Sequence, residues 1–217
     1  MIDLQRNVLV WLTAPGWDRV LANDKDAQAL SIFRHWALRA LPLVVCRQRV
    51  ENSPPTISLG LPAPSVWDRR KLALEVTPIE VGRVGRFPSF EQFEQFQQFK
   101  QLESCEAFIA AINEIRFNDP GFEGSIQVYG SFGWETLTGM AYVRPSSDLD
   151  LRIEVPDHET AAAVSRALNA LQLPMRVDGE LAFPDGSAIA WREYLQWVEG
   201  KVDRMLVKSR TSVGFIA

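Results

Sequence analysis

Apolar residues recur along this chain with two spacings, one typical of strands and one typical of helices. Short apolar runs and apolar–polar alternation predict strands at 8–12, 43–46, 71–76, 125–129, 148–155, 175–183, 187–190 and 205–207. Apolar positions at helical spacing predict helices over 26–41, 102–117, 132–138, 157–171 and 191–199. Strands and helices are interleaved, so we expect a mixed α/β (α+β) fold.

A proline-rich stretch, residues 52–88, is interpreted as the join between two domains. We therefore expect a small N-terminal α/β domain over residues 1–86 and a larger mixed-sheet domain over residues 87–217. Arg83 and Arg86 are expected in a glycine-flanked loop at this join. That loop could meet a phosphate-bearing ligand or could simply be a solvated basic loop.

Composition narrows the possible functions. The chain has 217 residues, 47% of them hydrophobic, and a formal net charge of −4, which argues against non-specific binding to nucleic acid or to an anionic membrane. Cys46 and Cys105 are the only cysteines and suggest no disulfide framework, so we expect a reduced, cytoplasmic setting. Asp3 and Arg6 interrupt the first residues, and neither a signal peptide nor a membrane anchor is expected.

Two carboxylates open the predicted strand 148–155. Side chains two apart on a strand point to the same face, so Asp148 and Asp150 should project together while Leu149 and Leu151 enter the core. Adjacent carboxylates repel unless a cation lies between them, and Mg²⁺ takes oxygen ligands. We therefore expect a metal pair here, although a single Asp-x-Asp is also common on protein surfaces.

Gly130 and Ser131 form the turn between the predicted strand 125–129 and the helix that follows. Such a turn exposes backbone N–H groups, which suit phosphate oxygens. Metal-binding carboxylates beside a phosphate cradle are the components needed for phosphoryl or nucleotidyl transfer.

Nucleotidyl transfer usually needs a third acidic group. Asp178 is the best candidate, on a strand that we expect to lie next to the strand of Asp148 and Asp150. Arg176 and Glu180 would share its face, and Glu180 is the reserve choice. The ordinary alternative is a solvated acidic residue at a bend.

Taken together, these motifs resemble the polymerase-β-like nucleotidyltransferase superfamily. The interval of 17 positions between Ser131 and Asp148 is longer than is typical there. The stretch from Tyr129 to Leu151, which contains that interval, narrows the choice: it resembles the signature of the phosphoribosyl-dephospho-CoA transferases, the holo-acyl-carrier-protein synthases of malonate decarboxylase. Residues 176–180 and 184–193, with Val207 and Lys208, are similar to the same family.

The resemblance implies attachment of a prosthetic group. A serine of the apo acyl-carrier subunit would attack the α-phosphate of 2′-(5″-triphosphoribosyl)-3′-dephospho-CoA and release pyrophosphate. Asp148, Asp150 and Asp178 would hold Mg²⁺, and Asp178 would bridge a metal or take the serine proton. Gly130 and Ser131 would cradle phosphates, with Arg176, Arg192 and Lys208 as candidate phosphate or carrier contacts.

Two alternatives stay open at this point. One is a nucleotidyltransferase that uses another nucleotide and another acceptor. The other is a non-catalytic module that only binds a nucleotide or a carrier protein.

Overall fold

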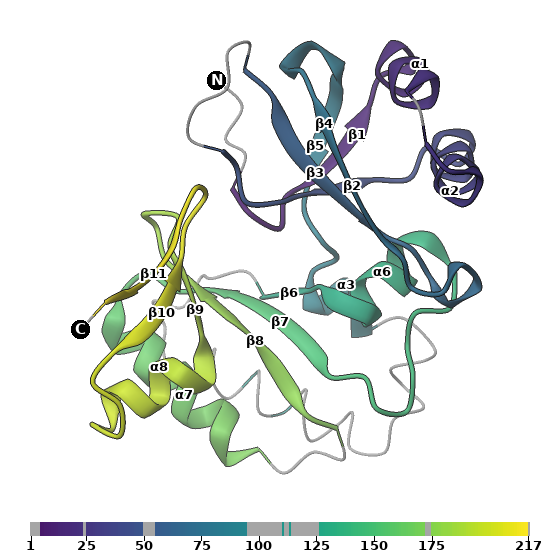
Figure 1. Cartoon of the computed structure of the whole chain (residues 1–217). Helices are drawn as coiled ribbons and strands as arrows, with labels where there is room; N and C mark the ends of the chain where they lie inside the picture. Colours follow the sequence, from purple (N-terminus) through teal and green to yellow (C-terminus); the bar gives the residue numbers. More distant parts are fainter. Residues whose placement is uncertain are drawn as a thin grey trace.

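The computed structural model describes residues 5–23, 25–49, 55–94, 110, 113, 126–171 and 175–216 of the chain. Its strands form two sheets, one built from the N-terminal part and one from the C-terminal part (Figure 1). Within these residues the architecture is α+β, which confirms the expected mixed fold class. None of the helices in the described ranges combines the length and apolarity that a membrane span requires.

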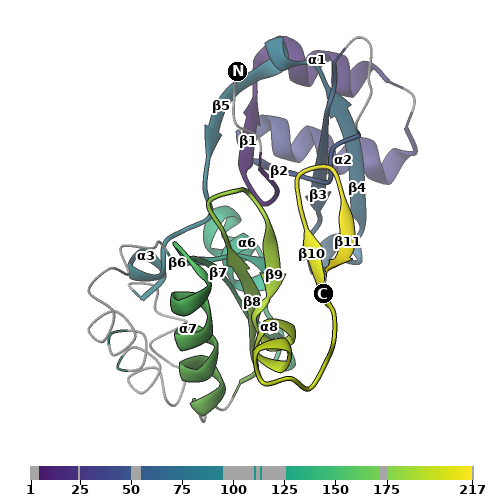
Figure 2. The same cartoon turned by 90° about the vertical axis from the view of Figure 1, so that its left-hand side faces the viewer.

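The N-terminal sheet has five antiparallel strands in the order β4-β3-β2-β1-β5. These strands are β1 (Leu9–Leu12), β2 (Leu43–Val45), β3 (Ile57–Pro62), β4 (Lys71–Val76) and β5 (Val81–Gly85). Helices α1 (Ala14–Ala22) and α2 (Ala27–Leu38) lie together on one side of this sheet (Figures 1 and 2). Val10 and Trp36, both fully buried, belong to the core between the helices and the sheet.

Two expectations for this part were wrong. Residues 52–88 are not a simple join, because they supply strands β3 to β5, and Arg83 lies within β5. Helix α1 was not predicted, because Pro15 follows the apolar run of β1 and suggested a turn. Thr13 caps this helix by accepting a hydrogen bond from the N–H of Gly16, and proline is favoured in a first helical turn.

The C-terminal sheet has six strands in the order β11-β10-β9-β8-β7-β6. These strands are β6 (Ile126–Val128), β7 (Leu149–Glu154), β8 (Val177–Ala182), β9 (Ala188–Ala190), β10 (Met205–Lys208) and β11 (Val213–Ile216). Only β7 and β8 pair in parallel among these neighbours; the other pairs are antiparallel. Strand β11 was not predicted.

Four further helices are described, α3 (Phe90–Glu94), α6 (Gly130–Thr138), α7 (His158–Ala170) and α8 (Trp191–Val198). Asp157 caps α7, because its carboxylate accepts the N–H of Thr160 at 2.8 Å. Helix α6 ends at Gly139, which adopts the left-handed conformation. Helix α2 ends at Leu38, three residues before the predicted Leu41. The predicted helix 102–117 lies almost entirely outside the described residues.

A small apolar cluster joins the two sheets. It contains Leu9 of β1, Phe87 after β5, Trp134 of α6 and Tyr142, all buried. The rings of Phe87 and Trp134 pack edge to face with centroids 5.4 Å apart. The predicted boundary between residues 86 and 87 falls beside this cluster and stays a prediction.

Candidate active site

Strands β7 and β8 bring the predicted acidic residues together. They lie side by side in parallel with Asp150 directly opposite Asp178, as expected from the sequence. Leu149 and Leu151 are buried in the core that α7 and α8 cover, so Asp150 projects from the opposite face. Asp178 projects with it, since Val177 on the same strand is buried in that core.

The start of α6 closes against Asp150. Gly130 adopts a φ of +60°, and a Cβ atom there would lie only 1.8 Å from Asp150 Oδ2. The N–H of Tyr129 donates to the Asp150 carbonyl oxygen at 3.0 Å, which fixes this contact. The helix begins at Gly130, so Gly130 and Ser131, which were predicted as a turn, are its first two residues. The Tyr129 side chain does not cap this helix, and Gly130 at its start lies against Asp150, so the positive end of the helix lies beside that carboxylate.

The charge at Asp150 is poorly compensated. Burial foremost, together with the neighbouring carboxylates of Asp178 and Asp148, raises the pKa of this carboxyl to about 6. Burial also raises the pKa of Tyr129, with contributions from Glu180, Asp150 and Asp178. The face that carries Asp148, Asp150 and Asp178, called the carboxylate face below, therefore concentrates negative charge in partly desolvated surroundings. Such surroundings favour a bound cation.

Arg176 partly meets this demand. Its guanidinium lies 2.8 Å from Asp178 and 3.7 Å from Asp148, and the shared face predicted for Arg176 and Asp178 is confirmed. Among the described residues, no group of three or more His, Cys, Asp and Glu side chains could hold a metal ion as they stand. The carboxylate oxygens of Asp148, Asp150 and Asp178 fit Mg²⁺ in type and charge.

The other predicted contacts are engaged elsewhere. Lys208 forms an ion pair with Glu180 at 2.5 Å, and Asn7 donates to the same carboxylate at 3.3 Å. Arg192 donates to the Val177 carbonyl oxygen at 2.9 Å, and its guanidinium lies over the Trp191 ring. Glu180 is paired with Lys208 and Asp178 with Arg176, and of these two carboxylates it is Asp178 that lies directly opposite Asp150.

Sequence reasoning missed Glu135, which organises the segment between the helix and Asp148. One of its carboxylate oxygens accepts the N–H groups of both Tyr142 and Val143 at 2.8 Å. The Tyr142 hydroxyl in turn donates to the Pro62 carbonyl oxygen at 2.8 Å, which ties this segment to the N-terminal sheet. The signal was present, because Glu135 and Tyr142 lie in the unusually long interval before Asp148.

Carboxylates on adjacent strand positions beside a helix N-terminus define a site suited to phosphoryl or nucleotidyl transfer. Comparison with known proteins identifies the family. Residues 5–87 match the model of the phosphoribosyl-dephospho-CoA transferase MdcG N-terminal domain, and residues 96–217 match that of the MdcG C-terminal domain. The chain belongs to this family and is a transferase.

Curated relatives agree with this assignment. A protein of Xanthomonas axonopodis pv. citri named phosphoribosyl-dephospho-CoA transferase is 30% identical over 94% of this chain and 90% of its own length. A protein of Bradyrhizobium diazoefficiens with the same name is 30% identical over 94% of this chain and 86% of its own length. No solved structure matches the chain.

Proposed function

We propose that this transferase attaches the phosphoribosyl-dephospho-CoA group to a serine of the apo acyl-carrier subunit of malonate decarboxylase. The serine Oγ forms a bond to the α-phosphorus of 2′-(5″-triphosphoribosyl)-3′-dephospho-CoA. The bond between that phosphorus and the bridging oxygen breaks, and pyrophosphate leaves. The product is a phosphodiester between the carrier serine and the ribose.

The observation that carries this proposal is the meeting of Asp150, Asp178 and the start of α6. The two carboxylates lie opposite each other on paired strands, and Gly130 brings the helix N-terminus against Asp150. Such an N-terminus suits phosphate oxygens. The names of the relatives supply the substrate class, and the carboxylate face supplies a reason for its phosphate chemistry.

Asp148, Asp150 and Asp178 would hold Mg²⁺, which when bound neutralises the triphosphate and the departing pyrophosphate. Asp178 is proposed to accept the proton from the carrier serine. Arg176 orients Asp178 through the ion pair at 2.8 Å and releases Asp148, the weaker contact at 3.7 Å, when the substrate binds. The first turn of α6 orients the phosphates.

The proposal is tested by incubating the protein with Mg²⁺, apo carrier and either triphosphoribosyl-dephospho-CoA or ATP, and measuring pyrophosphate. We expect pyrophosphate only with the CoA-derived substrate, and only when the carrier has its serine. Release from ATP alone would instead indicate a nucleotidyltransferase with another substrate. No pyrophosphate from any combination would contradict an enzymatic role at this face.

A further inference from the structure

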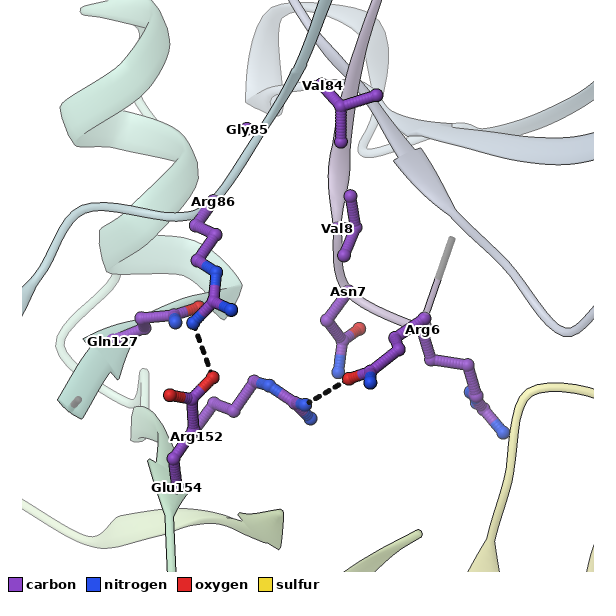
Figure 3. Close-up of a pocket in the computed structure, with 10 residues that line it drawn as sticks. Arg6, Asn7, Val8, Val84, Gly85, Arg86, Gln127, Arg152 and Glu154 are labelled. Carbon is purple, nitrogen blue, oxygen red and sulfur yellow. Dashed lines mark hydrogen bonds and ion pairs between the residues drawn. The ribbon is translucent and has the colours of Figure 1, made fainter. Parts of the chain in front are cut away.

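A cavity of about 290 Å³ lies between the two sheets, and its lining does not include the residues at the start of α6. Its walls come from the segment before β1, the end of β5 and strands β6 and β7 (Figure 3). The polar and charged residues that matter here are Arg6, Asn7, Arg86, Gln127, Arg152 and Glu154. They are distinct from Asp148, Asp150, Asp178 and the residues at the start of α6.

Arg152 is a buried cation that interacts electrostatically with Glu180 and Glu154 but forms no ion pair with them within the described residues. Arg152 is only 8% exposed. In the described part of the chain its guanidinium makes one hydrogen bond, to Gln5 Oε1 at 3.3 Å. A guanidinium has five N–H donors, and a buried charge is costly without an anionic partner. Glu180 lies opposite Arg152 on β8 but is already bound by Lys208. Arg152 therefore has donors available for a ligand.

Arg86 faces the same space from the other side. It forms an ion pair with Glu154 at 2.5 Å, and Figure 3 shows its guanidinium directed toward β7. The guanidinium of Arg6 points away from that of Arg152, although Arg6 also lines the cavity. Three arginines and one glutamate give the lining a formal charge of +2, in a chain whose net charge is −4.

Strand β7 contributes residues both to the cavity and to the carboxylate face. Arg152 follows Asp150 by two positions on β7 and shares its side of the sheet, so their Cα atoms are about 7 Å apart. Gln127 of β6 pairs with Arg152 across the sheet and is itself buried. A ligand that reacts beside Asp150 and extends along β7 would reach this cavity.

We propose that this cavity is a second phosphate-binding subsite, which holds the diphosphate of the dephospho-CoA portion while the triphosphate reacts beside Asp150. This inference rests on the proposed function, because that substrate carries two separate polyphosphate groups and only one of them reacts. Arg86 and Arg152 bind the diphosphate oxygens from opposite sides. Glu154 competes for Arg86 and must yield when the ligand binds.

The test is a calorimetric titration with dephospho-CoA, which carries the diphosphate but has no triphosphate to transfer. We expect Arg86→Gln and Arg152→Gln each to weaken binding roughly tenfold, since each removes a charged contact to phosphate. Glu154→Gln should tighten binding several-fold because it frees Arg86. Arg49→Gln, at the opposite edge of the N-terminal sheet, is the matched control and should leave binding unchanged.

Arg86 is largely exposed, so its variant keeps the test valid even if Arg152→Gln fails to fold. If the single variants Arg86→Gln and Glu154→Gln both bind dephospho-CoA with unchanged affinity, the proposal is overturned. Binding of inorganic pyrophosphate through Arg86, without binding of dephospho-CoA, would overturn the assignment to the CoA portion. Failure of the transfer assay with arginine-dependent dephospho-CoA binding would instead reject the proposed function and leave the subsite standing.

Discussion

At the scale of single residues, Asp150 is held in place from three sides. Gly130 presses against its carboxylate, Asp178 faces it across the strand pair, and its own carbonyl oxygen accepts the N–H of Tyr129. These contacts bring a carboxylate close to like charges and to the positive end of a helix. The position is unfavourable for the free protein and useful for binding a cation and phosphate.

Gly130→Ala should abolish most transfer activity, because the added Cβ would collide with Asp150 Oδ2. We expect a loss of about 100-fold or more in kcat/KM, which corresponds to a displacement of reacting groups by about 1 Å. Gly139→Ala is the matched control. It has a similar positive φ of 68°, but its Cβ would meet nothing within 4 Å.

In denaturant unfolding, Gly139→Ala should lose about 1 kcal/mol of stability from the left-handed backbone, and Gly130→Ala should lose more because of the added collision with Asp150. Only Gly130→Ala should lose activity. Equal activity losses in both variants would show that backbone strain, and not the contact with Asp150, sets the effect.

Asp150→Asn should stabilise the metal-free protein at pH 8. The folded-state pKa of about 6 lies above the ordinary value, so ionisation at higher pH opposes folding. The contribution is present in full below the ordinary pKa and is lost as pH rises through 6. After allowing for partial solvent screening, we expect a gain of about 1 kcal/mol in the free energy of unfolding.

A thermal-denaturation series with and without Mg²⁺ measures this effect. Mg²⁺ should raise the Tm of the natural protein and have little effect on Asp150→Asn. Asp203→Asn, outside the carboxylate face, serves as the charge control. An equal rise in Tm with Mg²⁺ for all three proteins would argue against a metal site at Asp150.

At the scale of elements, the segment between α6 and β7 is hydrogen-bonded on one side to α6 and on the other side to the N-terminal part of the chain. Glu135 accepts the N–H groups of Tyr142 and Val143 from within α6. On the other side the Ser65 hydroxyl donates to the Ala141 carbonyl oxygen at 3.0 Å. The turn between β3 and β4 therefore positions the segment that leads into Asp148.

Glu135→Ala should destabilise the protein by about 2 kcal/mol, because it leaves two backbone N–H groups without their acceptor. Activity should fall as well, since the segment leading to Asp148 loses its anchor. Glu135→Gln keeps an acceptor oxygen and should restore most of both properties. Thermal unfolding and kcat measured on the pair test this expectation; equal defects in Ala and Gln would show that the negative charge matters instead.

Glu80, in the short 3₁₀ helix between β4 and β5 (Pro78–Glu80), links that turn to α1. Its buried carboxylate accepts hydrogen bonds from Arg19 and from the Thr77 backbone, and Arg19 foremost lowers its pKa to about 2. This depressed pKa stabilises the fold fully above pH 4.5 and the effect is lost as pH falls toward 2. Glu80→Gln should therefore cost about 2 kcal/mol at pH 7.

Urea unfolding at pH 7 and at pH 3 measures this dependence, and the cost of Glu80→Gln should shrink at the lower pH. Glu75→Gln, an exposed partner of Arg49, should cost less than about 0.5 kcal/mol at either pH. A cost for Glu80→Gln that does not change with pH would indicate lost packing instead of a lost charge interaction.

At the scale of the whole molecule, the sequence predicted what local periodicity determines. Alternation placed Leu149 and Leu151 in the core and Asp150 opposite them, and the expected adjacency of β7 and β8 is confirmed. Helix α1 was missed because Pro15 suggested a turn, whereas it lies in the first turn of the helix. Strand β3 was missed because its sequence contains a glycine and a proline, although β2 and β4 pair with it on either side.

The features that could not be predicted from the sequence depend on contacts between residues that are far apart in the chain. Gln5 meets Arg152, Arg86 meets Glu154, and Lys208 meets Glu180. Each residue is ordinary in its local context, and only the packing of the two sheets brings the partners together. The same packing converts Arg86 from an apparent loop residue into a wall of the cavity.

The most direct test of the central claim is the intact mass of the apo carrier after incubation with triphosphoribosyl-dephospho-CoA and Mg²⁺. With the natural protein, the carrier should gain the mass of the substrate minus pyrophosphate. With Asp150→Asn, which should keep its fold, the gain should fall by orders of magnitude. No mass gain with the natural protein, or an equal gain with Asp150→Asn, would contradict the account.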